Sequence, residues 1–318
     1  MEGKGKGKKR EFDRKSGTGR GKEISNKGGT KIMCAVGTKE GEIVNLVQIP
    51  TTTPDISIPK VIDFFKQYPI RALGVASFGP IDINPKSPNY GKILTKVKKN
   101  WQDFGLIDAL KVLKVPMKLD TDVNGSCIGE MTFGTAKGLK NVVYITIGTG
   151  IGIGLASEGS MVHGIMHPEG GHICIPKNPN DKGESVCPYH SNCFEGLASG
   201  PSLFKRYGLS HAEMAERPEI WELEAEYIAI AVCHYIYVAC PQKIIIGGGV
   251  MKGVKDKEHF FNMIRERVKK YDNGYYNCPA MQHLNELIVP ESLEGKQGIL
   301  GGLVLGAEAL RERQTEDE

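Results

Sequence analysis

Glycine-rich turns beside short apolar runs are the feature that most restricts how this chain can fold. The run 141–147 leads into Gly148-Thr149-Gly150-Ile151-Gly152, the run 243–246 leads into Gly247-Gly248-Gly249-Val250, and Gly28-Gly29-Thr30-Lys31 precedes a third run. Short apolar runs are typical of buried strands, and glycine lets backbone amides approach phosphate oxygens closely. The turns at 28–30 and 148–150, each next to a strand, therefore suggest two related strand-turn units, as in a duplicated nucleotide-binding lobe.

Strands and helices alternate along the chain. Apolar runs predict strands at 32–36, 43–47 and 72–76, and the spacing of apolar residues predicts helices at 61–65 behind Pro59, at 219–240 and at 298–310. With 318 residues, of which 40% are hydrophobic, the chain is long enough for two lobes that each bury a core. This pattern predicts an α/β fold.

Composition excludes several classes of protein. No apolar run reaches the roughly 18 to 20 residues needed to cross a bilayer, and the start carries Lys and Gly where a signal peptide is apolar. We therefore expect a cytoplasmic protein without membrane contact. Three of the eight cysteines, Cys34, Cys127 and Cys278, have no cysteine nearby in the sequence. This distribution indicates reduced thiols with a metal site rather than a disulfide framework.

Positive charge is concentrated at the N-terminus. Residues 1–31 hold eleven of the 41 basic residues and four of the 37 acidic ones, so this head carries +7 and the remainder −3. Residues 1–27 contain Phe12 and Ile24 as their only sizeable apolar side chains after Met1, which predicts disorder. Such a basic segment is a solvated tail or an electrostatic handle for RNA.

A compact Cys/His loop is the most specific pattern in the sequence. Cys187, His190 and Cys193 are three residues apart, and His172 lies fifteen residues upstream of Cys187. Two thiolates and two imidazoles are a common tetrahedral ligand set for Zn²⁺, and four protein ligands without an open position indicate a structural site. Cys174 is a competitor for the place of His172 that we rank lower. We interpret His163 and His167 as ordinary polar loop residues.

Acidic residues precede a helix of small residues at 119–130. Asp120, Asp122 and Asn124 follow a short apolar stretch there. In the simplest interpretation, Asp122 or Asp120 is the N-cap of this helix and has no other role. The same position could also hold a catalytic carboxylate rigidly, next to backbone N–H groups that meet sugar hydroxyls.

Seven ordered motifs make the chain similar to a known family. They are the three glycine turns, 121–125, 167–172, the Cys187-Pro188-Tyr189-His190 loop with Cys193, and 195–201. Over about residues 28–312 the chain resembles the ROK family of sugar kinases and repressors, and within it the zinc-containing fructokinases. The resemblance implies the actin-like, ribonuclease-H-like pair of α/β domains with the active site in the cleft between them. It implies ATP-dependent phosphorylation of a hexose, with D-fructose as the favoured substrate and fructose 6-phosphate as the product.

The resemblance also assigns roles to residues. Asp122 is implied to be the general base, and the sugar is implied to contact Asn124, Glu169, His172 and Glu195. The implied ATP-binding residues are Gly28, Gly29, Thr30, Lys31, Gly148, Thr149, Gly150, Gly152, Gly247, Gly248 and Gly249. Mg²⁺ accompanies ATP, Zn²⁺ occupies the Cys/His loop, and a homodimer is expected. The expected organisation is a disordered head at 1–27, a small lobe at 28–120 closed by a helix at 302–318, and a large lobe at 121–301.

The match fails at the start of the chain. Family members begin with an apolar strand that ends in an acidic residue two places before Gly-Gly-Thr, where this chain has Asn26 followed by Lys27. The segment 22–25 is a poor buried strand, and residues 5–24 instead resemble an Arg/Gly-rich motif of hyaluronan- and mRNA-binding proteins. We therefore expect a graft without the first strand, and a weak kinase with a raised requirement for Mg²⁺.

Three alternative functions compete with this interpretation. A ROK repressor would need a helix-turn-helix domain of roughly 60 residues ahead of the sugar domain, for which we see no room. A protein that binds RNA or the ribosome through residues 1–27 would show salt-sensitive binding. Within the kinase class, glucose, mannose or an N-acetylated amino sugar could replace fructose, although the Cys-Pro-Tyr-His loop favours fructose.

Overall fold

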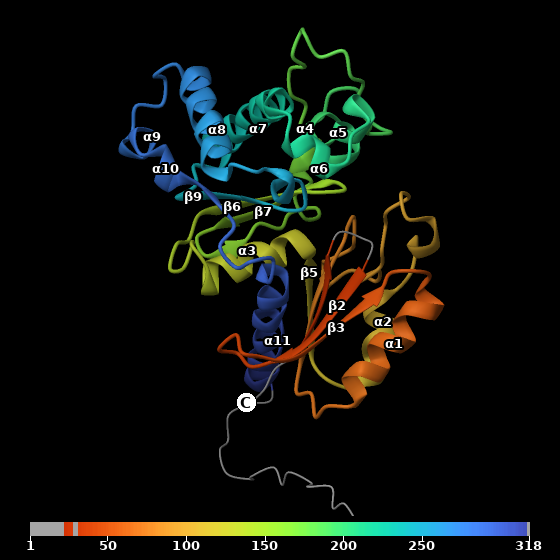
Figure 1. Cartoon of the computed structure of the whole chain (residues 1–318). Helices are drawn as coiled ribbons and strands as arrows, with labels where there is room; N and C mark the ends of the chain where they lie inside the picture. Colours follow the sequence, from red (N-terminus) through yellow and green to blue (C-terminus); the bar gives the residue numbers. More distant parts are fainter. Residues whose placement is uncertain (1–21, 28–30, 317–318) are drawn as a thin grey trace, which may run out of the picture.

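Two five-stranded sheets form the framework of the chain in a computed structural model that describes residues 22–27 and 31–316 (Figure 1). The first sheet has the order β3-β2-β1-β4-β5, with bounds Ile43–Pro50, Lys31–Gly37, Lys22–Lys27, Leu73–Ser77 and Met117–Thr121. The second has the order β10-β9-β6-β7-β8, with bounds Ile288–Pro290, Lys243–Gly247, Val142–Ile147, Ile151–Ser157 and Ser160–Met161. We call these sheets, with the helices on their outer faces, the first and second lobes.

The two sheets repeat one topology. In the first, β1 pairs antiparallel with β2 and parallel with β4, and in the second, β6 pairs antiparallel with β7 and parallel with β9. The two central hairpins also close alike, because Lys27 pairs with Lys31 and Ile147 pairs with Ile151. The internal duplication suggested by the two glycine turns is therefore present, and it includes a strand before residue 28 that was not predicted.

The expectation that the first strand is missing was wrong. β1 spans Lys22–Lys27 and lies between β2 and β4, with Ile24 opposite Cys34 on one side and Val75 on the other. The composition of a segment is a weak guide to strand formation when neighbouring strands supply backbone partners on both sides. The rest of the predicted disordered head, residues 1–21, lies outside the described residues, as do residues 28–30.

The first lobe buries its core between its sheet and two helices, α1 (Pro54–Lys66) and α2 (Leu106–Leu110). Val61 and Phe65 of α1 are fully buried against Leu73 of β4. α1 begins at Pro54 rather than behind Pro59, because Pro54 fits the first helical turn, where its missing N–H has no partner to lose. Between α1 and α3 the chain also forms the 3₁₀ turns η1 (Lys99–Trp101) and η2 (Lys111–Leu113).

The second lobe has apolar cores on both faces of its sheet. Along β6, Val143, Ile145 and Ile147 belong to the core under the outer helices, whereas Val142 and Tyr144 belong to the core under α3 (Asp122–Phe133). This alternation is the period of two expected for a strand buried on both faces. The outer helices include α7 (Pro218–Ala239) and α8 (Lys257–Asp272), and α7 matches the helix expected over 219–240.

Short elements connect these helices and strands. They are η3 (Gly170–His172), α4 (Phe194–Ala198), α5 (Gly200–Tyr207), α6 (His211–Ala215), η4 (Val250–Gly253), α9 (Pro279–Gln282) and α10 (Leu284–Leu287). No helix in the described ranges, 22–27 and 31–316, is both long and apolar enough to cross a membrane.

The lobes meet where α3 crosses α11 (Gln297–Glu316), the last helix, which lies against the inner face of the first sheet (Figure 1). The backbones approach closely, because a Cβ atom on Gly301 would lie 1.7 Å from the carbonyl oxygen of Gly125. A Cβ atom on Gly129 would lie 2.1 Å from the carbonyl oxygen of Gln297. Any larger residue at these crossing points would push the two helices apart.

Candidate active site and metal cluster

Asp122 stands at the carboxyl end of β5, in the first turn of α3. The N-cap is Thr121, whose Oγ1 accepts a hydrogen bond from the Asn124 backbone N–H at 3.1 Å. The expectation that Asp122 or Asp120 is the cap was therefore wrong, because the cap must precede the first helical residue and Asp122 is already within the helix. The Oδ1 atom of Asp122 accepts from the Val123 N–H at 2.8 Å, which orients the carboxylate at the helix start.

Asn124 points back toward Asp120 and His163. Its Nδ2 atom donates to Asp120 Oδ1 at 2.7 Å, while its Oδ1 atom is buried without a hydrogen-bond partner among the described residues. His163 Nε2 lies 3.1 Å from Asp120 Oδ2, and this hydrogen bond raises the pKa of His163 above its usual value. An amide fixed in this way leaves one oriented acceptor for a ligand hydroxyl. His163 is thus part of the site rather than an ordinary loop residue.

Two further carboxylates come from the second lobe. Glu195, in α4, accepts a hydrogen bond at Oε2 from the backbone N–H of Ile151 at 2.9 Å, directly after the glycine turn 148–150. Partial burial, and then the charges of Glu195 and Asp122, raise the pKa of Glu169 to about 7. The structure therefore places Glu169 within electrostatic reach of both Asp122 and Glu195, although the three residues come from separate segments.

His167 fixes the segment that carries Glu169 to the first lobe. It is buried, with 6% of its surface exposed, and its Nε2 atom accepts from the Ile81 backbone N–H at 3.2 Å. Its Nδ1 atom lies 3.5 Å from Glu169 Oε1, and a Cβ atom on Gly79 would lie 2.9 Å from the His167 ring. The interpretation of His167 as an ordinary polar loop residue was therefore wrong. Burial lowers the pKa of His167, which keeps the ring neutral and able to accept this bond.

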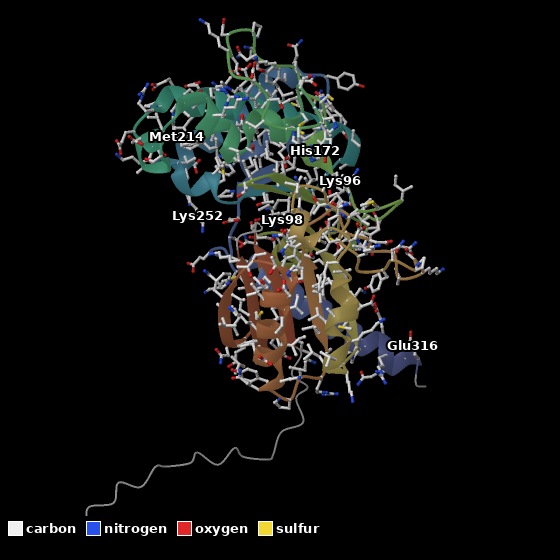
Figure 2. All side chains as sticks on the ribbon, turned by 90° about the vertical axis from the view of Figure 1, so that its right-hand side faces the viewer. Lys96, Lys98, His172, Met214, Lys252 and Glu316 are labelled. Atoms are coloured by element: carbon white, nitrogen blue, oxygen red, sulfur yellow. The ribbon has the colours of Figure 1, made fainter. Side chains whose placement is uncertain are left out.

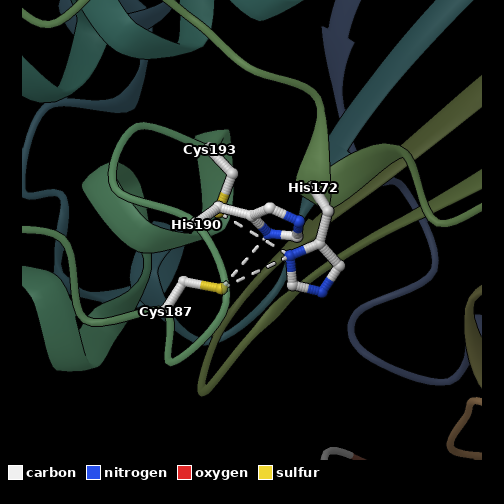
Figure 3. Close-up of side chains that lie close together, drawn as sticks. All are labelled: His172, Cys187, His190 and Cys193. Atoms are coloured by element: carbon white, nitrogen blue, oxygen red, sulfur yellow. Dashed lines mark hydrogen bonds between the residues drawn. The ribbon is translucent and has the colours of Figure 1, made fainter.

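The four predicted metal ligands converge (Figure 3). The ligand atoms of His172, Cys187, His190 and Cys193 all lie within 4.8 Å of one another. His172 Nδ1 lies 3.8 Å from Cys187 Sγ and 3.7 Å from Cys193 Sγ, and Cys187 Sγ lies 3.5 Å from His190 Nδ1. A tetrahedral Zn²⁺ with S and N ligands spaces neighbouring ligand atoms by about 3.4 to 3.8 Å. The cluster contains His172, whereas Cys174 is exposed outside it.

His172 connects this cluster to the carboxylates. While Nδ1 faces the two sulfur atoms, Nε2 on the opposite side of the ring lies 3.9 Å from Glu195 Oε1. Cys193 is the N-cap of α4, the helix that carries Glu195, and its sulfur accepts from the Gly196 N–H at 3.3 Å. Anything that immobilises the cluster therefore also immobilises Glu195.

Two glycine turns of the second lobe border a cavity of about 480 Å³. Its lining comprises Gly148, Thr149, Gly200, Pro201, Phe204, Leu209, Ser210, Met214, Gly249 and Val250. Gly248 has φ +100°, and a Cβ atom there would lie 2.4 Å from the carbonyl oxygen of Ile147, so this turn requires glycine. A lining that combines the backbone of glycine turns with apolar side chains such as Phe204 and Met214 suits a nucleotide with its phosphates and its base.

The other predicted nucleotide-binding residues lie elsewhere or outside the description. Gly152 is within β7 and packs against Thr146 and Val123, so it does not line the cavity. Lys31 begins β2, whereas Gly28, Gly29 and Thr30 are outside the described residues. Gly247 lies at the end of β9, where a Cβ atom would lie 1.9 Å from Glu291 Oε2.

A family model described as the ROK family matches residues 26–309. The chain belongs to the ROK family. The fructokinase of Pediococcus pentosaceus is 41% identical over 285 residues, which cover 89% of this chain and 96% of that protein. The fructokinase of Streptococcus mutans is 38% identical over 284 residues, which cover 87% of this chain and 94% of that protein.

Solved ROK structures share the fold. The crystal structure of a ROK hexokinase from Thermus thermophilus superimposes with a TM-score of 0.74 at 21% identity, covering 92% of this chain and 99% of that one. The predicted family and the actin-like two-domain fold are therefore confirmed. Spacing in the sequence predicted the Cys/His cluster of this ROK protein. The contact of His163 with Asp120 and that of His167 with Ile81 were not predicted, because each joins segments that are distant in the sequence.

Proposed function

We propose that the chain is a cytosolic ATP-dependent fructokinase that transfers the γ-phosphoryl group of ATP to the 6-hydroxyl of D-fructose. The observation that carries this proposal is that Glu169 lies within electrostatic reach of Asp122 and Glu195, and that Glu195 accepts a hydrogen bond directly after the glycine turn 148–150. The same glycine turn borders a cavity large enough for a nucleotide, and Asp122 stands at the start of α3. Two ROK relatives that bear the name fructokinase support fructose as the substrate.

The residues divide the chemistry between them. Asp122 takes the proton of the 6-hydroxyl as that oxygen attacks the γ-phosphorus, a contribution that is typically 10²- to 10⁴-fold for general bases. Asn124, Glu169, His172 and Glu195 bind the other sugar hydroxyls and so hold the attacking oxygen in line. ATP enters as its magnesium complex and lies in the cavity, with its phosphates at the glycine turns.

Zinc would stiffen the sugar side of this site. The cluster of two sulfurs and two imidazole nitrogens has the spacing of a tetrahedral Zn²⁺ site, and four protein donors leave no position for substrate. We therefore propose a structural Zn²⁺ held by His172, Cys187, His190 and Cys193. The bound zinc would hold the loop in one conformation, so that His172 and Glu195 face the sugar in a fixed orientation.

A coupled assay with ATP and a panel of hexoses tests the activity. We expect fructose to be phosphorylated with a kcat/KM at least about tenfold above glucose, mannose and N-acetylated amino sugars. Product analysis should identify fructose 6-phosphate. A preference for glucose, mannose or an amino sugar would support the kinase activity but contradict fructose as the substrate. Inactivity with every sugar would contradict both parts of the proposal.

A homodimer is part of the same proposal. The end of α7 and the segment after α8 expose Tyr237, Val238 and Tyr275, of which Val238 is 84% and Tyr275 81% exposed. The Tyr237 and Tyr275 rings pack edge to face with centroids 6.0 Å apart, forming an apolar surface that a second copy could cover. Light scattering is expected to give twice the chain mass, and a monomer at all concentrations would contradict this.

A further inference from the structure

The amino group of Lys98 is buried and has no hydrogen-bond partner among the described residues. Lys98 belongs to the segment between β4 and α2, and Figure 2 shows it at the junction of the two lobes. Lys96 and Lys99 of the same segment are exposed. A buried ammonium group with three unused donors is costly, because water is lost and nothing replaces it. Its position indicates that a ligand supplies the missing acceptor oxygens.

The segment holds Lys98 in place through Trp101. The Trp101 side chain is 3% exposed, donates from Nε1 to the Thr52 carbonyl oxygen at 2.7 Å, and contacts Phe78 edge to face. The Trp101 backbone N–H donates to the Lys98 carbonyl oxygen at 2.8 Å. These contacts fix the backbone from which the Lys98 side chain extends over the Phe78 ring.

Lys98 lies beside the proposed catalytic base. Its Nζ atom is 3.8 Å from the centre of the Phe78 ring, a distance at which a cation is attracted to an aromatic face. Phe78 and Asp122 follow Ser77 and Thr121, which pair at the carboxyl ends of the parallel strands β4 and β5. Burial lowers the pKa of Lys98, and the charge of Asp122 opposes that shift. The ammonium group therefore shares its surroundings with the Asp122 carboxylate.

Negative charge gathers at this place. The charges of Glu195 and Asp122 both act on Glu169, so carboxylates from separate segments already share this part of the molecule. Phosphoryl transfer brings a group to the sugar oxygen near Asp122 that carries about −1.5 to −2 charge as a phosphate monoester. Without a positive partner from the first lobe, the product phosphate would face three carboxylates.

We propose that the Lys98 ammonium group binds the phosphoryl group as it passes from ATP to the sugar 6-oxygen, and holds it on the product. This inference rests on the proposed sugar kinase activity and assigns to it a residue that acts on the phosphate rather than on the sugar hydroxyls. The P–O bond to ADP breaks, the P–O bond to the sugar forms, and the proton goes to Asp122. Lys98 neutralises charge and remains protonated throughout.

Calorimetric titration of fructose 6-phosphate and fructose separates this role from sugar binding. We expect Lys98→Met to weaken fructose 6-phosphate binding at least about tenfold while fructose affinity stays within about twofold of the wild type. Lys98→Arg, which keeps the charge, should recover most of the product affinity. Lys96→Met is the matched control on the same segment and should bind both ligands like the wild type.

The outcomes are distinct. Unchanged product affinity in Lys98→Met, or an equal loss of fructose and fructose 6-phosphate affinity, overturns the assignment of Lys98 while leaving the kinase intact. If the wild type neither makes nor binds fructose 6-phosphate, the proposed function and this inference fail together.

The pKa of the bound product phosphate gives a second test, on the wild-type protein alone. The second ionisation of a phosphate monoester has a pKa of about 6, and ³¹P NMR can follow it in the bound product. A neighbouring ammonium group favours the dianion, so we expect this pKa to fall when fructose 6-phosphate binds. A rise would show that the three carboxylates dominate the surroundings of the phosphate, and it would overturn the proposal.

Discussion

Asp122 is held at the start of α3 by its two neighbours in the sequence. Thr121 caps the helix, and the Val123 N–H orients the Asp122 carboxylate. We expect Asp122→Asn to fold normally and bind fructose within a few-fold of the wild type, with kcat lower by several orders of magnitude, because a base acts mainly in the transition state. Steady-state kinetics and fructose calorimetry check this. More than about a tenth of wild-type turnover in the variant would exclude Asp122 as the base.

The hydrogen bond between His163 and Asp120 gives a pH-dependent contribution to stability. Because the folded state raises the pKa of His163 above 6.5, the contribution is complete below that value and is lost as the pH rises through the folded pKa. His163 is 42% exposed at its side chain, so the effect is small. We expect the Tm advantage of the wild type over His163→Gln to shrink between about pH 6 and about pH 9. An advantage that stays constant or grows over this range would contradict the assignment.

At the scale of elements, the Cys/His loop and α4 form one unit. Cys193 both caps α4 and contributes a sulfur to the cluster, so losing a ligand should loosen the helix that carries Glu195. We expect one Zn²⁺ per chain in the wild type, and loss of zinc with a lower Tm in Cys187→Ser and Cys193→Ser. Cys174→Ser is the matched control, since Cys174 is exposed outside the cluster. Metal analysis that finds stoichiometric zinc in both ligand variants would reject the site.

The strand β1 sets where the basic head can be removed. Deletion of residues 1–27 removes the strand between β2 and β4, so we expect the first lobe to lose its cooperative unfolding. Deletion of residues 1–21 keeps β1, and we expect Tm and turnover close to those of the full chain. Thermal melts and the coupled assay compare the two proteins. Equal stability of both deletions would mean that β1 is dispensable, and salt-sensitive RNA binding lost with residues 1–21 would support the RNA-binding alternative.

On the scale of the whole molecule, local patterns predicted more than long-range contacts. The glycine turns suggested the duplication, because a glycine turn next to an apolar strand is a local pattern that recurs in both sheets. The spacing of Cys187, His190 and Cys193 predicted their convergence for the same reason. β1 was missed because one of its two partners, β4, is distant in the sequence, and Lys98 was missed because its contact with Phe78 joins separate segments.

The packing of α11 determines the order in which the two lobes can finish folding during synthesis. The second sheet uses strands between residues 142 and 290, which leave the ribosome as one continuous stretch. The first sheet is made earlier, yet the helix that covers its inner face is the last element of the chain. An early sheet with one open apolar face is a target for chaperones and for association between nascent chains. The lobe that is translated first is therefore the last to become complete, once α11 has left the ribosome.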